Sequence, residues 1–354
     1  MGGPPTSARR RATISQVAQL AGVSKATVSK AFNNRGGVSV ETRDRVLRVA
    51  ESLGWRPSAR AVALTSGGAG AIGFLLNRPP DLLSSDPYFG ELISGIERPL
   101  AEHGFWLLLQ IAEHADAAEE RHAYADLAQT QRVDGVFLAE TRIIDQRFDI
   151  VAELGLPAVI VSRPWGSTAL PWEGAGYPGG GVADAVAHLA ELGHRQLAYV
   201  AGPHDRSHVQ YRTDAFLAAV AAHGLSVLGI VRTDFSAEAG YRATDELLGQ
   251  RERPTAILYD SDPMAIAGCR AARARGLSVP GDVSVIGHDD IHLSRWTTPA
   301  LTTIQQDVQE LGERCALRLL ELLGVTTAPH GPLPDPRLVV RESTGPAPTG
   351  PRRG

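Results

Sequence analysis

Hydrophobic and polar positions follow two different patterns along the chain. Before residue 57, apolar side chains recur every three or four positions in short stretches separated by tight turns, which is typical of small amphipathic helices. From Ala71 onward, short continuous apolar runs alternate with helical stretches that end at glycine. Between them, Pro57 to Gly70 starts with a possible short helix, SARAVALTS, and becomes glycine-rich, which is linker composition. We therefore expect a helical head, a linker and a larger body.

The body contains two sets of apolar runs that predict strands. They lie at 71–76, 106–111, 135–139 and 158–162, and then at 196–202, 227–232, 256–260 and 283–289. Because the runs are continuous rather than alternating, they indicate parallel strands that are covered by helices on both faces. Such a repeating pattern fits two α/β lobes better than one. The glycine- and proline-rich stretch 165–181 between the two sets is consistent with a crossing between lobes.

Residues 13–32 of the head, TISQVAQLAGVSKATVSKAF, have the pattern of a helix-turn-helix. Thr13 precedes a first helix, Gly22 permits the left-handed backbone that the corner requires, and Ser24 suits the N-cap of a second helix. Val28 and Phe32 face inward. The second helix then presents outward the residues Lys25, Ala26, Ser29 and Lys30.

Outward residues near the start of such a helix reach base edges when it lies in the major groove. Lysine donates to guanine O6 and N7, and alanine contacts a thymine methyl group. Lys25 and Lys30 are the only lysines of the chain. The alternative is that they are ordinary solvated charges. A third helix follows, with an inward stripe of Val46, Val49, Ala50 and Leu53. Ser39 and Thr42 at its start suit phosphate contacts.

Charge is distributed unevenly between head and body. Residues 1–60 hold nine arginines and two lysines against three acidic residues, a net charge of +8 in a chain whose total is −4. A basic head on an acidic body favours a head that binds a polyanion, although a basic solvated surface is the alternative. The two cysteines, Cys269 and Cys315, lie in apolar helical stretches and read as buried free thiols. No apolar run is long enough to span a bilayer, and no signal peptide is recognisable, so a cytoplasmic protein is expected.

Several long stretches resemble the LacI/GalR family of bacterial repressors between residues 13 and 343. They are TISQVAQLAGVSKATVSKAFN, VSVETRDRVLRVAESLGWRPSA, HLAELGHRQLAYVAGP, SDPMAIAGCRAARARGLSVPGDVSVIGHDDI, TPALTTIQQDVQELG and LVVRES. The resemblance implies a DNA-binding domain, a hinge helix, and an effector domain with the fold of periplasmic sugar-binding proteins. It also implies a homodimer that binds near-palindromic, double-stranded operator DNA.

The resemblance further implies roles for individual head residues. Those that match base-reading positions are Lys25, Ala26 and Lys30. Those that match backbone-contacting positions are Thr13, Ser24, Ser29, Asn33, Ser39 and Thr42. Leu64 matches the leucine that inserts into a minor-groove step. The hinge departs from the family pattern, because Val62 stands where a basic residue is usual and Arg60 where an apolar one is usual.

In the effector domain, the resemblance points to a cleft between the lobes. The implied effector-binding residues are Tyr88, Phe89, Ser162, Arg163, Arg206, His208, Arg212, Phe235, Ser261 and Asp289. An aromatic ring beside charged groups that form strong hydrogen bonds suits a small polar ligand such as a sugar. The alternatives are core packing for Tyr88 and Phe89 and a structural ion pair for Arg212 and Asp289. Two motifs depart from the family, at 176–178 and at 260–262. Trp165 could stack on a sugar ring or pack within its loop.

Two other classes of protein compete with a regulator. An extracytoplasmic solute-binding protein would fit the body alone, but it would lack the basic head and would carry a signal sequence. An enzyme or metal protein could use the paired histidines of HDRSH (204–208) or HDDIH (288–292). Both pairs follow strands, where the four-residue spacing loses its helical geometry. No nucleophile elbow or phosphate loop is present. We expect no catalysis, no cofactor and no bound metal.

The predicted fold class is an all-α helix-turn-helix head followed by an α/β body like periplasmic binding proteins, with two doubly wound parallel-sheet lobes. The expected limits are 1–11 for a disordered N-terminus, 12–57 for the head, 58–70 for hinge helix and linker, 71–343 for the body, and 344–354 for a disordered tail. Within the body, we expect lobe 1 at about 71–163 and 293–323, and lobe 2 at about 164–292 and 324–343.

The predicted function is that of a nucleoid-associated transcriptional repressor. A small polar effector, sugar or sugar-like, would shift the arrangement of the lobes and thereby change operator affinity. A corepressor-dependent regulator that responds to a nucleobase is the alternative within the same family. The sequence leaves induction and corepression equally open.

Overall fold

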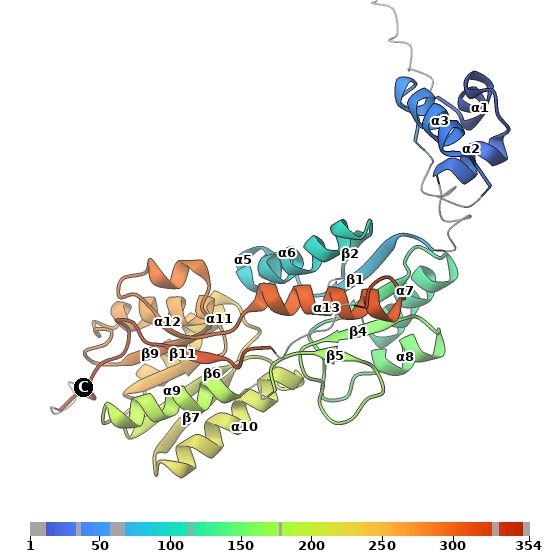
Figure 1. Ribbon diagram of the computed structural model, residues 1–354. Coiled ribbons are helices and arrows are strands. Elements are labelled where there is room, and N and C mark those ends of the chain that lie inside the picture. Colours follow the sequence, from blue (N-terminus) through green and yellow to red (C-terminus); the bar gives the residue numbers. More distant parts are fainter. Residues whose placement is uncertain are drawn as a thin grey trace, which may run out of the picture. The chain divides into compact units, whose positions relative to one another are not determined.

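The computed structural model describes residues 12–32, 37–56, 68–112, 116–176, 179–327 and 333–349. The head, up to Gly70, and the bulk of the body form separate compact units (Figure 1). Several residues that the sequence analysis singled out lie outside the described residues, namely Asn33, Arg60, Val62, Leu64, Tyr177 and Pro178.

The head contains the predicted helix-turn-helix. Its helices are α1 (Ile14–Ala21), α2 (Lys25–Phe32) and α3 (Val40–Ser52). Thr13 caps α1 through a capping box, in which its side chain and that of Gln16 each bond the other's backbone N–H. Gly22 has a φ of +66°, so it takes the left-handed conformation predicted for the corner. The Ser24 hydroxyl accepts from the Thr27 N–H at 3.0 Å, as expected of an N-cap.

A small apolar core holds these three helices together. Its buried members are Val17, Ala18, Ala21, Val28, Ala31, Val46 and Ala50. Phe32 and Trp55 pack edge to face against each other, with ring centroids 5.3 Å apart, and extend this core. Leu20, although apolar, is 63% exposed on α1. The spacing of the buried residues leaves the charged faces of α2 and α3 in solvent.

Lobe 1 of the body is a parallel five-stranded sheet in the order β2-β1-β3-β4-β5. Its strands are β1 (Ala71–Asn77), β2 (Trp106–Ala112), β3 (Gly135–Leu138), β4 (Ala158–Val161) and β5 (Trp172–Glu173). The helices between these strands are α5 (Pro80–Ser85), α6 (Pro87–Glu102), α7 (Ala117–Gln129) and α8 (Arg147–Glu153). Helix α13 (Val308–Leu322) joins them from much later in the chain.

Lobe 2 is a six-stranded sheet in the order β11-β10-β9-β8-β6-β7, parallel except for β11. Its strands are β6 (Gln196–Ala201), β7 (Ser226–Arg232), β8 (Ala256–Tyr259), β9 (Ser284–Asp289), β10 (Thr302–Gln305) and β11 (Arg337–Val339). The helices are α9 (Gly180–Glu191), α10 (Ser207–Ala222), α11 (Ala237–Leu248) and α12 (Asp262–Ala274), with a 3₁₀ turn η1 (His292–Arg295). All eight strands predicted from apolar runs are therefore present, and the predicted fold class is confirmed.

The expected limits of the lobes need two corrections. Strand β5 pairs with β4, so lobe 1 continues beyond residue 163. Strand β10 pairs with β9, so lobe 2 continues beyond residue 292. Both strands are too short and too polar to stand out as apolar runs, because β5 has two residues and β10 reads TTIQ. The chain passes between the lobes after β5, between β10 and α13, and between α13 and β11.

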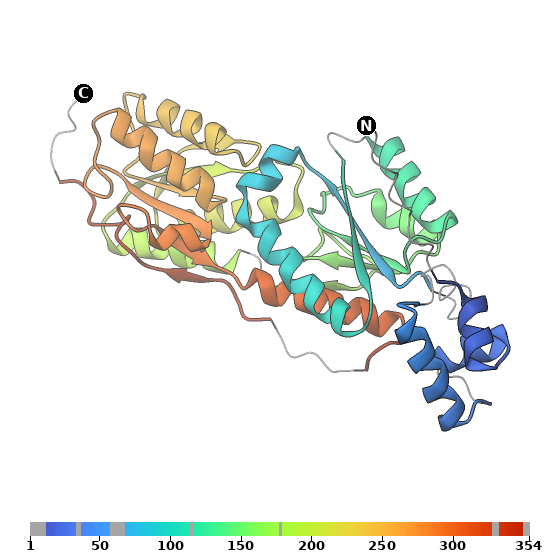
Figure 2. The same cartoon turned by 90° about the horizontal axis from the view of Figure 1, so that it is seen from above.

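Helix α13 is held in lobe 1 by a close approach to α6 (Figure 2). A Cβ atom on Gly95 of α6 would lie 2.0 Å from the Gln309 carbonyl oxygen, and one on Gly312 of α13 would lie 2.4 Å from that of Leu92. Only glycine therefore permits the two helix backbones to pack at this distance. On the other side of α13, Arg314 and Arg318 pair with the buried Glu173 of β5.

The C-terminal segment does not begin a disordered tail at residue 344, contrary to expectation. The Gly345 carbonyl bonds the ring of buried His194 at 3.0 Å, and the Ala347 N–H donates to the Leu192 carbonyl at 2.9 Å. The proline- and glycine-rich composition hid these backbone contacts, which lie on lobe 2. Among the described residues, no helix is long and apolar enough to cross a membrane.

Asp262 at the start of α12 joins three parts of lobe 2. Its carboxylate accepts from the Ile291 N–H at 2.9 Å and from the hydroxyls of Ser294 and Thr303, each at 2.6 Å. These donors belong to the loop after β9, to η1 and to β10. Burial raises the pKa of Asp262 to about 7 even though three hydrogen bonds lower it.

We expect Asp262→Ala to lower the free energy of unfolding of the body by about 3 kcal/mol, because it leaves three buried donors without an acceptor. Urea denaturation of the full chain measures this loss. Asp262→Asn is the matched control, since it keeps the shape and one acceptor oxygen, and its loss should be smaller. Equal stability of the alanine variant and the wild type would contradict the anchoring role.

Candidate ligand pocket and nucleic-acid interface

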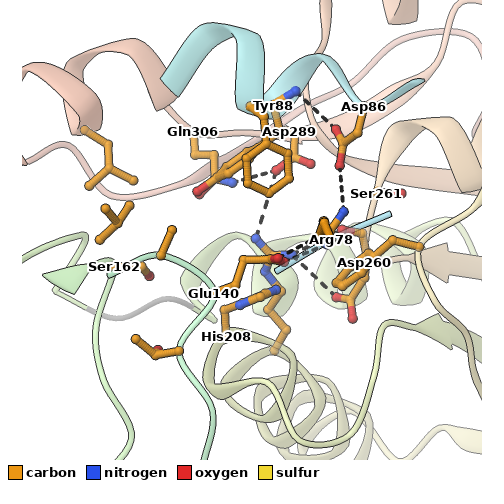
Figure 3. A pocket seen from close by; sticks show the side chains of 17 residues that line it. Arg78, Asp86, Tyr88, Glu140, Ser162, His208, Asp260, Ser261, Asp289 and Gln306 are labelled. Carbon is orange, nitrogen blue, oxygen red and sulfur yellow. Dashed lines mark hydrogen bonds and ion pairs between the residues drawn. The ribbon is translucent and has the colours of Figure 1, made fainter. Parts of the chain in front are cut away.

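A pocket lies between the two lobes, where the carboxyl ends of their strands meet. Lobe 1 contributes Arg78 after β1, Glu140 after β3 and Ser162 after β4. Lobe 2 contributes Asp260 after β8 and Asp289 at the end of β9 (Figure 3). Parallel α/β sheets bind ligands at this edge, because the loops that follow the strands converge there. The pocket is thus the place in the body that suits a ligand best.

Eight of the ten residues expected to bind effector line this pocket. They are Tyr88, Phe89, Ser162, His208, Arg212, Phe235, Ser261 and Asp289. The other two expected residues do not line it. Arg163 donates to the Gly176 carbonyl at 2.6 Å and lies over the rings of Trp172 and Tyr211. Arg206 lies at the N-cap of α10 and reaches the Glu140 carbonyl at 3.5 Å. Both are arginines beside the cleft, where sequence position alone does not say which way the side chain turns.

The backbone is strained around the pocket. Among the described residues, positive φ angles outside glycine occur at Gln131 and Asp290 and at four pocket residues, Glu140, Ser162, Phe235 and Asp289. Their φ angles of 52°, 75°, 71° and 102° lie where side chains other than glycine are rarely found. Such strain persists only where surrounding structure enforces it, and it gathers at functional sites. This is independent support for the pocket.

On the lobe 2 side of the pocket, Arg212 lies beside two carboxyl groups, those of Asp260 and Asp289. The Arg212 guanidinium donates to the Asp260 carbonyl at 3.1 Å, lies 3.7 Å from the Asp260 carboxylate, and is 4.0 Å from Asp289. Its Nε is buried and has no hydrogen-bond acceptor among the described residues. At 4.0 Å the contact between Arg212 and Asp289 is too long for a hydrogen bond, so the Arg212 Nε–H is available to a ligand. The Asp289 carboxyl accepts from the Gln306 side chain at 2.6 Å and keeps further hydrogen-bonding capacity.

Burial changes the protonation of the pocket carboxylates. It raises the pKa of Asp289 to about 8, although Arg212 acts in the opposite direction. Burial likewise raises the pKa of Asp260, which accepts from the Tyr199 hydroxyl and from the Gly202 N–H. Near neutral pH Asp289 is thus largely a neutral carboxylic acid, able to donate a hydrogen bond or, after losing its proton, to accept one.

The Phe235 ring and the neutral ring of His208 complete the lobe 2 side of the pocket. The His208 ring stacks on Phe235 with centroids 5.8 Å apart. Burial, together with Arg212, Arg206 and Arg78, holds the pKa of His208 well below its usual value, so the ring is uncharged. His288 in β9 is also buried, with a lowered pKa for the same reason, and neither ring nitrogen has a partner among the described residues.

Three charged residues of lobe 1 line the pocket although the sequence analysis did not single them out. Arg78 donates from Nε to Glu140 at 2.8 Å and its Nη2 lies 2.7 Å from the same carboxylate. Asp86, which caps α6, lies 3.6 Å from Arg78. A signal was present in the sequence, since an arginine directly after an apolar strand is placed at the sheet edge where ligands bind.

Trp165 and the two histidines of HDDIH, which the sequence analysis singled out, do not line the pocket. Trp165 packs on Tyr211, with ring centroids 4.7 Å apart, so it serves loop packing rather than the pocket. His288 lies within β9 rather than on a loop, and His292 begins η1. In the part of the chain that the structure describes, no three histidine, cysteine or acidic side chains gather as metal ligands would.

On the head, α2 presents an exposed face that contains Lys25, Ala26 and Lys30. Ser29 on the same helix is half-buried. Thr13, Ser24 and Ser39 are exposed at the N-termini of α1, α2 and α3, where each side chain accepts a backbone N–H. Ser39 also donates to the Thr42 hydroxyl at 2.9 Å. Helix N-termini with exposed hydroxyls and free N–H groups favour phosphate oxygens.

Comparison with known proteins supports this division into head and body. Residues 13–58 match the model of the family described as bacterial regulatory proteins, lacI family, and residues 186–344 match a periplasmic binding protein-like domain. The chain is 34% identical over 339 residues to the HTH-type transcriptional repressor CytR of Escherichia coli K12, covering 94% of this chain and 96% of that protein. It is 33% identical over 345 residues to the repressor PurR of Klebsiella pneumoniae, covering 95% and 98%.

Solved structures of regulators are also similar to this chain. A Lac repressor dimer bound to operator and the anti-inducer ONPF superposes with a TM-score of 0.82 at 28% identity, over 95% of this chain and all of that one. A complex of the transcriptional regulator CelR with cellobiose gives a TM-score of 0.69 at 30% identity, over 94% of this chain and all of that one. The similarity therefore extends across both units.

The raised pKa of Asp289 makes a prediction for stability against pH. The folded state holds a proton that an unfolded carboxyl, with a pKa of about 3.9, releases, so Asp289 destabilises the fold increasingly from about pH 4 to about pH 8. Asp289→Asn removes this penalty. Its melting temperature should therefore rise relative to wild type as pH increases from about 5 to about 8.5, in thermal denaturation. A difference that stays constant with pH would contradict the raised pKa.

Proposed function

The chain belongs to the lacI family of bacterial regulatory proteins, and from this we propose that it represses transcription as a homodimer on near-palindromic operator DNA, under control of a sugar-like effector. It is a helix-turn-helix DNA-binding repressor with an effector domain, as are its relatives named CytR and PurR. The identity of the effector, the operator geometry and the oligomer are the proposed parts. We further propose that it acts at the nucleoid in the cytoplasm and is not an enzyme.

The observation that carries the effector proposal is the arrangement of Arg212, Asp289 and Phe235. A guanidinium with an unused Nε–H stands 4.0 Å from a carboxyl group that can donate or accept, beside an aromatic ring. Sugar hydroxyl groups both donate and accept hydrogen bonds, and a sugar ring presents an apolar face to an aromatic ring. The CelR structure with cellobiose is a relative of known fold that holds such a ligand.

A nucleobase is the second candidate for the effector. A base that displaces Arg78 would stack on the Phe235 ring, and an ionised Asp289 would accept from base N–H groups. A thermal-shift screen of sugars, sugar phosphates and nucleobases separates the candidates, because a bound ligand raises the apparent stability by mass action. We expect stabilisation by a sugar. Stabilisation by a nucleobase alone would replace the sugar proposal with a corepressor one.

For operator DNA, we propose that α2 lies in the major groove. The exposed Lys25, Ala26 and Lys30 would contact base edges, while Thr13, Ser24, Ser29, Ser39 and Thr42 would contact the backbone. Asn33 is proposed as a further backbone contact and Leu64 as a minor-groove wedge, both outside the described residues. The basic head and the exposed helix N-termini support this placement.

For the homodimer, we propose a second copy of this chain against the outer edge of lobe 1. Strand β2 is the edge strand of its sheet and exposes an apolar row of Trp106, Leu108, Leu109 and Ile111, with Trp106 80% exposed. An edge of this kind is normally covered, because it would otherwise promote uncontrolled association. An effector that rearranges the lobes would then alter the spacing of the paired heads and so the operator affinity.

The role of α2 predicts different effects for two head substitutions. Lys30→Ala should relax base preference at one position of each half-site by about 1–3 kcal/mol of discrimination. Ser39→Ala should weaken binding evenly across sequences, since it removes a phosphate contact and a helix cap. Binding-site selection with each variant measures both effects. Identical sequence preferences for wild type and Lys30→Ala would remove Lys30 from base reading.

The role of the pocket predicts the behaviour of Arg212→Ala. It should lose the response of operator binding to the effector found in the thermal-shift screen, while ligand-free protein still binds DNA. Gel-shift titration measures both properties. Arg163→Ala is the matched control, because Arg163 lies near the cleft without lining the pocket, and it should respond normally. A full response from Arg212→Ala would exclude Arg212 from effector binding.

A further inference from the structure

The Arg78 guanidinium lies between two aromatic rings that come from different lobes. Its central carbon is 5.0 Å from the ring centroid of Phe89 on α6 of lobe 1, and 4.9 Å from that of Phe235, which follows β7 in lobe 2. The residue is only 7% exposed. Both distances are within the range of cation–π contacts, which are strongest where water is excluded.

Acidic groups of lobe 1 hold this guanidinium in place. The Glu140 carboxylate lies 2.8 Å from Nε and 2.7 Å from Nη2 of Arg78, and Asp86 lies 3.6 Å from Nη1 (Figure 3). Burial alone would lower the pKa of Arg78, but the neighbouring acidic groups, Glu140 foremost, together outweigh it and the pKa is raised, so the group remains a cation. Two carboxylates and two aromatic rings are the surroundings that a planar cation requires.

We propose that Phe89, Phe235, Glu140 and Asp86 form a guanidinium-binding box that Arg78 of the same chain fills, and that this occupancy latches lobe 2 onto lobe 1. Three of the box residues and Arg78 itself belong to lobe 1, whereas Phe235 alone belongs to lobe 2. Separation of the lobes therefore breaks one contact in particular, the one between Arg78 and Phe235. That contact favours the closed arrangement when no effector is bound.

A second set of contacts crosses between the lobes beside the box. The Ser207 N–H donates to the Thr141 carbonyl and the Ile143 N–H to that of Asp205, each at 2.8 Å. These backbone bonds align the loops after β3 and β6, but any side chains at those positions could form them. The box differs because it requires a cation and two rings, and because it lies in the pocket. An effector that stacks on Phe235 must compete with Arg78 for the ring.

The effect of the latch on operator binding rests on the proposed function. The latch itself can be tested without DNA or effector. Nitroxide labels at Glu102→Cys on α6 and Glu246→Cys on α11 report the distance between lobes by pulsed electron paramagnetic resonance. Both positions are exposed. The background carries Cys269→Ser, and labelled chain is diluted with unlabelled chain so that only distances within one chain are measured.

We expect a narrow distance distribution for the wild type. Arg78→Ala should broaden it, with the ratio of open to closed molecules increasing at least about fivefold, the equivalent of one cation–π contact of about 1 kcal/mol. Phe235→Leu should broaden it equally, because it removes the ring of lobe 2 while Arg78 and Glu140 remain paired. Arg121→Ala is the control, since it breaks an exposed ion pair with Glu153 on lobe 1, and it should leave the distribution unchanged.

Chemical rescue distinguishes the box from a general loss of packing. Millimolar methylguanidinium should restore the narrow distribution of Arg78→Ala, while methylurea, which has the same shape without the charge, should not. Rescue should be absent from Arg78→Ala/Phe235→Leu. A wild-type distribution in both single variants would overturn the latch, and equal rescue by methylurea would overturn the cation site. Operator binding by the wild type is measured separately, so a failed latch does not count against the proposed function.

Discussion

Burial of two guanidinium groups between two lobes is the constraint on which the pocket depends. A cation removed from water needs carboxylates and hydrogen-bond acceptors around it. Arg78 meets this need with Glu140 and Asp86 from lobe 1, and Arg212 with Asp260 and Asp289 from lobe 2. Each lobe thus surrounds its own cation with acidic groups, and each cation keeps one buried N–H without an acceptor among the described residues.

This arrangement depends in turn on how the body is folded. Parallel strands place the charged residues at one edge of each sheet, and four residues that line the pocket, Glu140, Ser162, Phe235 and Asp289, have positive φ angles. The lobes are not independent along the chain, because α13 returns to lobe 1 after β10 has completed part of lobe 2. Close packing of Gly95 and Gly312 and the pairing of Glu173 with two arginines hold α13 there.

The head follows a simpler physical rule. Seven small or branched apolar residues make its core, and the capping residues at the helix N-termini also carry the exposed hydroxyl groups that we propose contact DNA phosphates. A helix cap and a phosphate contact make the same demand on a side chain, namely a short polar group beside free N–H donors. This is why the function of the head is readable from local sequence.

The sequence alone was therefore sufficient for the head, for eight strands of the body, for the two-lobed fold class and for eight of the residues that line the pocket. Local periodicity, caps and the Gly22 corner depend on neighbouring residues, and the resemblance to a family supplied the positions in the cleft. Only the tertiary structure placed β5 and β10, tied residues 344–347 to lobe 2, and showed that Arg163 and Arg206 do not line the pocket.

The tertiary structure also decided the position of Arg78, which the sequence shows merely as a charged residue after an apolar strand. Its partners lie on α6, after β3 and after β7, and Phe235 lies in the other lobe. Contacts between residues so far apart in the chain produce no periodic pattern and no characteristic spacing in the sequence. They exist only once both sheets are folded and the lobes have met.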